Sequence, residues 1–108
     1  MNNQLRYKLF KVKKGKRDMF IAWTEELQRR NSEVITTLKY ENVAMETMYI
    51  FSVSNEWFVI GMQVLVGKHR KADMTVELNK RHFEVLTECL VPYNGAVLYE
   101  FTRRNIKL

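Results

Sequence analysis

The segment from Trp57 to Val66, WFVIGMQVLV, constrains the fold of this chain more than any other. A strand with one face in water alternates apolar and polar side chains, whereas this segment is apolar at nearly every position. A strand of this kind needs cover on both faces. The chain has 108 residues and only two substantial helical patterns to provide cover. We therefore expect a second copy of the chain to cover one face.

Composition indicates one globular domain over residues 1–108. Hydrophobic residues at 46% and charged residues at 28% are near globular averages. Cys89 is the only cysteine, so no intrachain disulfide can form. The first residues show no apolar region typical of a signal peptide, so we expect a cytoplasmic protein. No apolar run is long enough to cross a bilayer, and no membrane partner is expected.

Local patterns predict the order β-α-(α)-β-β-α-β. Apolar alternation and turn residues indicate the strands, and apolar arcs indicate the helices. The expected strands are Leu5 to Val12, Val43 to Val53, Trp57 to Val66 and Ala96 to Thr102. The expected helices are Asp18 to Arg30, a short segment ending near Glu41, and Asp73 to Leu90.

With right-handed crossovers, this order gives an α+β ferredoxin-like sandwich with a four-stranded antiparallel sheet. Its helices cover one face of the sheet, and the other face stays bare and apolar. Burying six such side chains would contribute on the order of 10 kcal/mol, so we expect a homodimer through the open sheet face. Either Leu5, Tyr7 and Leu9 or Phe10 and Val12 face the helices; the alternation alone does not decide.

The turn VKKGK at residues 12–16, followed by Phe20, Trp23 and Leu27, resembles the opening of the dimeric α/β-barrel superfamily. There a strand ends in a Gly-Lys turn and leads into a helix with an aromatic face. The order of elements also matches over the whole chain. Within that superfamily, the segment ADMTVELNKRHFEVLTECL at residues 72–90 is similar to a small bacterial family of unknown function.

The superfamily resemblance implies a homodimer with its two sheets face to face, and a ligand cleft between each sheet and its helices. Members include antibiotic-biosynthesis monooxygenases, haem-degrading oxygenases, muconolactone isomerases and sugar mutarotases, so the resemblance selects no activity. Trp57 and His82 are loosely comparable with residues of the haem degraders. Their first-strand Asn has no counterpart between Leu5 and Val12, and we expect no cofactor.

His82 is the polar residue that most suggests chemistry. A helical wheel places it on the apolar arc of its helix, with Asn79 and Thr75 nearby and the charged side chains opposite. A histidine in an apolar cleft can act as acid, base or ligand anchor, which makes His82 the candidate catalytic residue. The alternative is a core histidine bonded to a neighbouring group.

The predicted ligand site lies between the sheet and the helix that carries His82. Its expected lining residues are His82, Asn79, Trp57 and Trp23. The two tryptophans can stack on an aromatic ligand, but the sequence favours helix core for Trp23 and strand-end packing for Trp57.

Two other kinds of site are disfavoured by the sequence. His69, Asp73 and Glu77 recur at four-residue spacing, but the basic residues around His69 argue against a metal site. The net charge of +6 suggests nucleic acid, and RNA-binding modules share this order of elements. The third strand, however, lacks their basic-Gly-aromatic pattern, which argues against nucleic-acid binding.

The sequence therefore predicts a protein that binds a small molecule in a cleft, or transforms one without a cofactor. Whether it is an enzyme is not decided. The alternative is a structural or interaction module with no ligand pocket.

Overall fold

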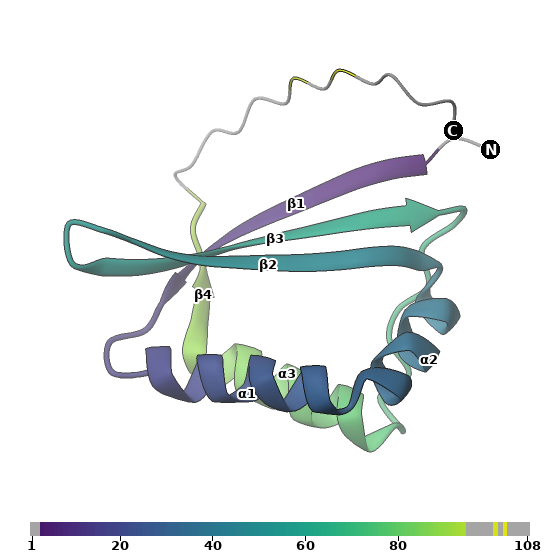
Figure 1. The fold of residues 1–108 in the computed structure, drawn as a ribbon, viewed down its shortest axis with the longest axis horizontal. Coiled ribbons are helices and arrows are strands. Elements are labelled where there is room, and N and C mark those ends of the chain that lie inside the picture. Colours follow the sequence, from purple (N-terminus) through teal and green to yellow (C-terminus); the bar gives the residue numbers. More distant parts are fainter. Residues whose placement is uncertain (1–2, 95–100, 102, 104–108) are drawn as a thin grey trace.

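The computed structural model describes residues 3–94, 101 and 103. The elements are β1 (Asn3–Val12), α1 (Arg17–Arg29), α2 (Asn31–Glu41), β2 (Val43–Val53), β3 (Glu56–Val66), α3 (Glu77–Cys89) and β4 (Leu90–Pro92). The strands form one antiparallel sheet in the order β2-β3-β1-β4, with the helices on one face (Figure 1). This is the expected ferredoxin-like α+β sandwich.

Two expected elements differ from the structure. The last helix begins at Glu77 instead of Asp73, because the Asp73 carboxylate accepts hydrogen bonds from the Thr75 backbone N–H (2.9 Å) and hydroxyl (2.6 Å) and so closes a turn ahead of the helix. The strand expected from Ala96 to Thr102 lies outside the described residues, apart from Phe101. The observed fourth strand follows α3 directly and pairs with the end of β1.

The strand register decides which side chains face the helices. Phe10 lies opposite Val59, and Val59 lies opposite Ile50. Val59 is completely buried, so these three residues belong to the inner face of the sheet, which the helices cover. Their neighbours Leu9 and Tyr49 therefore lie on the outer face, because successive side chains of a strand alternate.

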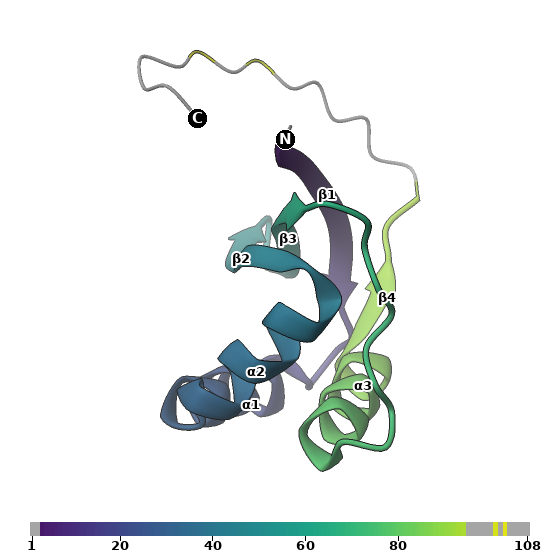
Figure 2. The ribbon, with the colours of Figure 1, turned by 90° about the vertical axis from the view of Figure 1, so that its right-hand side faces the viewer.

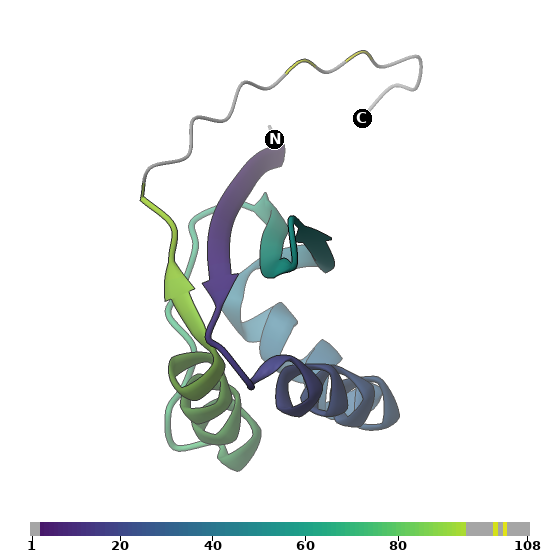
Figure 3. The same cartoon turned by 90° about the vertical axis from the view of Figure 1, so that its left-hand side faces the viewer.

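The core lies between the inner face and the helices α1 and α3. Figures 2 and 3 show these two helices beneath the sheet, with α2 turning from the helix layer toward β2. Phe20 and Cys89 are completely buried, and burial raises the pKa of the Cys89 thiol, as expected for an inert core residue. The buried cluster consists of Val12, Phe20, Trp23, Val59, Leu78, Val85, Cys89 and Leu90.

The outer face of the sheet is apolar and carries an aromatic cluster. Phe51 stacks on Phe58 with ring centroids 5.7 Å apart, and Tyr93 meets Phe58 edge-on at 5.6 Å. Apolar residues of this face that are at least 38% exposed are Met45, Tyr49, Phe51, Val53, Val91 and Tyr93. Among the helices of the described chain, none is long and apolar enough to cross a membrane.

Candidate functional site

A cavity of about 280 Å³ lies between the inner face of the sheet and the helices α2 and α3. Gly61 belongs to its floor, flanked by Lys8 on β1 and Met48 on β2. Because Gly61 has no side chain, the space above it stays open. The apolar wall residues are Phe10, Leu27, Val34, Leu38, Met48, Met62, Ala72, Met74, Leu78, Phe83 and Leu86.

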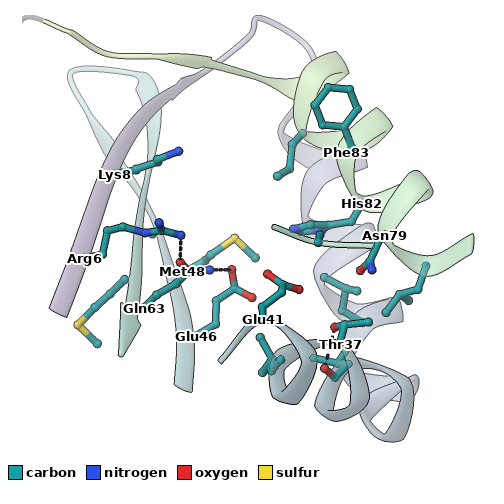
Figure 4. A pocket seen from close by; sticks show the side chains of 18 of the residues that line it. Arg6, Lys8, Thr37, Glu41, Glu46, Met48, Gln63, Asn79, His82 and Phe83 are labelled. Carbon is teal, nitrogen blue, oxygen red and sulfur yellow. Dashed lines mark hydrogen bonds between the residues drawn. The ribbon is translucent and has the colours of Figure 1, made fainter. Parts of the chain in front are cut away.

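Polar side chains enter the cavity from both layers of the fold (Figure 4). The strands contribute Arg6, Lys8, Glu46 and Gln63, and the helices contribute Thr37, Glu41, Asn79 and His82. Ligand sites characteristically combine a mostly apolar wall with a few convergent polar groups. The cavity has this character, and its volume is near the lower end of the usual range of roughly 300–1,000 Å³.

His82 projects its ring into the cavity from α3 (Figure 4). Its Nδ1 accepts a hydrogen bond of 2.8 Å from the indole Nε1–H of Trp23 on α1. Burial lowers the pKa of His82, and the charge of Glu46 opposes this shift only in part. The ring is therefore neutral near pH 7, with its single proton on Nε2.

Asn79 lies one turn before His82 and is only 8% exposed. Its Nδ2 donates a hydrogen bond of 2.9 Å to the backbone carbonyl of Asp73, which ties α3 to the loop between β3 and α3. Met74 of this loop also lines the cavity. Asn79 thus both holds the loop in place and contributes an amide to the cavity wall.

A chain of side-chain hydrogen bonds crosses the floor of the cavity from strand to strand. Arg6 Nη2 donates to Gln63 Oε1, and Gln63 Nε2 donates to Glu46 Oε1 over 3.2 Å. The three residues occupy directly opposite positions on β1, β3 and β2. Sequence reasoning missed this chain, although Gln63 is the only polar side chain in the apolar strand from Trp57 to Val66.

Glu41, at the end of α2, directs its carboxylate into the same cavity (Figure 4). Burial raises its pKa, the nearby charge of Glu46 adds to this effect, and Arg6 opposes it. A carboxyl group with a raised pKa in a cavity is a candidate proton donor or acceptor. Glu41 was also not singled out from the sequence, since its charge is unremarkable at the end of a helix.

The four residues predicted to line the site are not all brought together. His82 and Asn79 line the cavity, whereas neither tryptophan does. Trp23 is 4% exposed and stands behind His82, which it contacts through its indole N–H. Trp57 packs against the core, and its ring lies under the guanidinium of Arg17, 4.9 Å from the ring centroid. Neither tryptophan therefore lines this cavity, contrary to expectation.

The residues at metal-like spacing have other contacts. Glu77 pairs with Arg30 at 2.6 Å, Asp73 bonds Thr75, and His69 lies 3.4 Å from a nitrogen of Arg6. Over residues 3–94, 101 and 103, no group of three or more His, Cys, Asp or Glu residues is placed to hold a metal ion.

The fold and the cavity define a small α+β protein of ferredoxin-like architecture. The chain belongs to a family of unknown function, DUF6176, whose model matches residues 3–103. No curated protein and no solved structure matched the chain. The expected similarity to a small family of unknown function is confirmed, and this membership brings no activity with it.

Proposed function

We propose that this protein binds an apolar small molecule in the cavity between the sheet, α2 and α3, with His82 as its principal polar contact. The observation that carries this proposal is the placement of the His82 ring, which enters an apolar cavity while Trp23 occupies its Nδ1. The other ring nitrogen, Nε2, carries the proton and can donate it in a hydrogen bond to a ligand in this cavity.

A second function, cofactor-independent catalysis, is favoured by one further observation. Glu41 faces the same cavity, and its carboxyl group has a raised pKa. A neutral imidazole and a carboxyl group whose pKa values are shifted in opposite directions can serve as an acid–base pair. Catalysis would require both side chains to contact the bound molecule. A test of catalysis therefore follows the demonstration that a small molecule binds.

The proposal extends to assembly and location. We propose a homodimer in which two outer faces pack together, as in the dimeric α/β-barrel superfamily. The aromatic cluster of the outer face supports this: Phe51 and Tyr93 are exposed beside the half-buried Phe58, and an apolar patch of this kind marks an interaction surface. The single, buried Cys89 suits a reducing cytoplasm.

The decisive experiment is a screen of small apolar molecules against the ¹⁵N-labelled protein by two-dimensional NMR. We expect binders to shift the amide resonances of cavity residues such as Leu78 and His82. His82→Ala should weaken binding about tenfold, and Gly61→Val should abolish it by filling the floor. Lys80→Ala, an exposed position on the same helix, is the matched control and should leave binding unchanged.

Two results would contradict the proposal. One is a screen in which no molecule shifts cavity resonances, which would favour an interaction module without a pocket. The other is binding that survives Gly61→Val, because the ligand would then occupy another part of the surface.

A further inference from the structure

We infer that His82 donates the hydrogen bond of its Nε2–H to a neutral carbonyl oxygen of the bound molecule, and that Trp23 is the positioning residue that keeps His82 in the tautomer this requires. The inference rests on the proposed small-molecule site and deepens it by naming the chemical class of the ligand.

The role of Trp23 follows from the chemistry of the indole. An indole Nε1–H can donate a hydrogen bond but cannot accept one. It lies 2.8 Å from Nδ1 of His82, so this nitrogen must present a lone pair. The neutral imidazole then carries its proton on Nε2. Trp23 is held in the core at 4% exposure, beside the completely buried Phe20, so its indole cannot turn away to serve another tautomer.

The same contact opposes protonation of the ring. An imidazolium would place an N–H at Nδ1 against the N–H of Trp23, and burial already disfavours the charge. The charged groups that share the cavity come from three elements: Arg6 and Lys8 from β1, Glu46 from β2, and Glu41 from α2. Glu46 favours the imidazolium, but not enough to reverse the effect of burial. His82 is thus a neutral donor.

A neutral donor in this cavity selects its acceptor. The ligand atom at Nε2 must carry a lone pair, which excludes an ammonium group. The cavity holds two acidic and two basic side chains, so a carboxylate gains no net attraction there, and it would lose hydration that a neutral His82 does not replace. A carbonyl oxygen accepts the hydrogen bond without adding charge. The ligand class is therefore an apolar molecule with a ketone, aldehyde, ester or amide group.

Three probes with a common phenyl ring separate the alternatives: acetophenone, benzoate and benzylamine. We expect acetophenone to bind at least about tenfold more tightly than either charged probe in NMR titrations. Acetophenone labelled with ¹³C at its carbonyl should show its infrared C=O band moved to lower frequency when bound. In His82→Ala, the bound carbonyl should lose this displacement.

The tautomer is measured directly on the wild-type protein by long-range ¹H–¹⁵N NMR of its two histidines, His69 and His82, with His82→Gln for assignment. We expect an unprotonated Nδ1 and a protonated Nε2 at His82. Trp23→Phe should give a mixture of tautomers and a smaller carbonyl displacement. Adding His82→Gln to Trp23→Phe should restore the displacement, because an amide donates without help from the indole.

The outcomes separate the two proposals. A proton on Nδ1 in the wild-type protein overturns the inference. Tighter binding of benzoate than of acetophenone also overturns it, and a loss of that benzoate affinity in Lys8→Gln would show that Lys8 binds the carboxylate. Binding in the cavity without a displaced carbonyl band overturns the inference and leaves the proposed function standing. Failure of all three probes to shift cavity resonances overturns both. If Trp23→Phe does not fold, the wild-type tautomer and carbonyl band still decide.

Discussion

Trp23 on α1 and His82 on α3 are joined across the helix layer by a hydrogen bond of 2.8 Å between the indole Nε1 and the imidazole Nδ1. Trp23→Phe removes the donor and leaves Nδ1 without a partner in a largely buried place. We predict a loss of roughly 2–3 kcal/mol in the free energy of unfolding, from the unpaired group and the smaller ring. Urea denaturation measures it. A double-mutant cycle with His82→Ala isolates the bond, and a coupling near zero would contradict its role.

The two histidines should make the protein less stable as the pH falls. Burial lowers the pKa of His82 and is also the main cause of the lowered pKa of His69, so the unfolded chain takes up protons first, near the ordinary value of 6.5. Stability should therefore decrease from about pH 7.5 to about pH 5.5. The pKa of Glu41 is raised in the folded protein, so this carboxyl group takes up its proton more readily in the folded than in the unfolded chain. Its protonation therefore favours the folded state as the pH falls, opposite to the effect of the histidines.

Thermal unfolding of variants across this range separates these contributions. His82→Gln and His69→Gln should each flatten the dependence of the melting temperature on pH. Glu41→Gln should steepen it where that carboxyl group titrates, above its ordinary value of 4.5. A slope that His82→Gln leaves unchanged would show that this ring titrates as freely in the folded protein as in the unfolded chain.

Gly61 offers a way to separate stability from ligand binding. A Cβ atom added there would meet only the Lys8 backbone oxygen, at 3.9 Å, which is an ordinary contact. Glycine within a strand costs roughly 0.5–1 kcal/mol, so Gly61→Val should raise the unfolding free energy by about that amount while its methyl groups occupy the cavity floor. A more stable protein that no longer binds the probe is the expected result. Destabilisation by more than about 1 kcal/mol would show that the floor is already filled.

Much of the fold is predictable from alternation and apolar arcs, but the choice of inner face is not. Leu9 and Phe10 are both apolar, so each alternate set on the first strand is a reasonable core face. The choice is made by the pairing of Phe10 with Val59 and by the packing of α1 and α3 on that side. These are contacts between segments far apart in the sequence, which no local pattern contains.

The candidate site divides in the same way. A helical wheel suffices to bring His82 and Asn79 to one face of one helix. It cannot find the chain from Arg6 through Gln63 to Glu46, because that chain depends on strand register. The position of Trp57 outside this cavity has a related cause: alternation assigns a strand residue to a face of the sheet but does not locate it along the strand relative to the cavity.

Trp57→Phe should therefore leave ligand binding unchanged. The Trp57 ring contacts Arg17 and the core instead of the cavity, so we predict an affinity within about twofold of the wild-type value, against a tenfold loss in His82→Ala. The chain has only two tryptophans, so this variant also makes Trp23 the sole source of tryptophan fluorescence. Titration followed by this fluorescence then reports on the environment of His82. A large loss of affinity in Trp57→Phe would show that Trp57 contributes to ligand binding.

The outer face of the sheet should be the dimer interface. Tyr49 is 57% exposed on this face, near the ring stack of Phe51 on Phe58. A stable interface buries about 800 Å² per partner, and a charge at its centre is strongly unfavourable. We predict that the wild-type protein sediments as a dimer at micromolar concentration. Tyr49→Lys should sediment as a monomer, and an unchanged circular dichroism spectrum would show that the variant is folded. Ile35→Lys is the matched control: it places a lysine at another exposed apolar position, 42% exposed, but on α2, and it should remain dimeric. A monomeric wild-type protein at every concentration would contradict the dimer. The cavity and its test would stand, because the cavity floor lies on the inner face of the sheet, opposite the proposed interface.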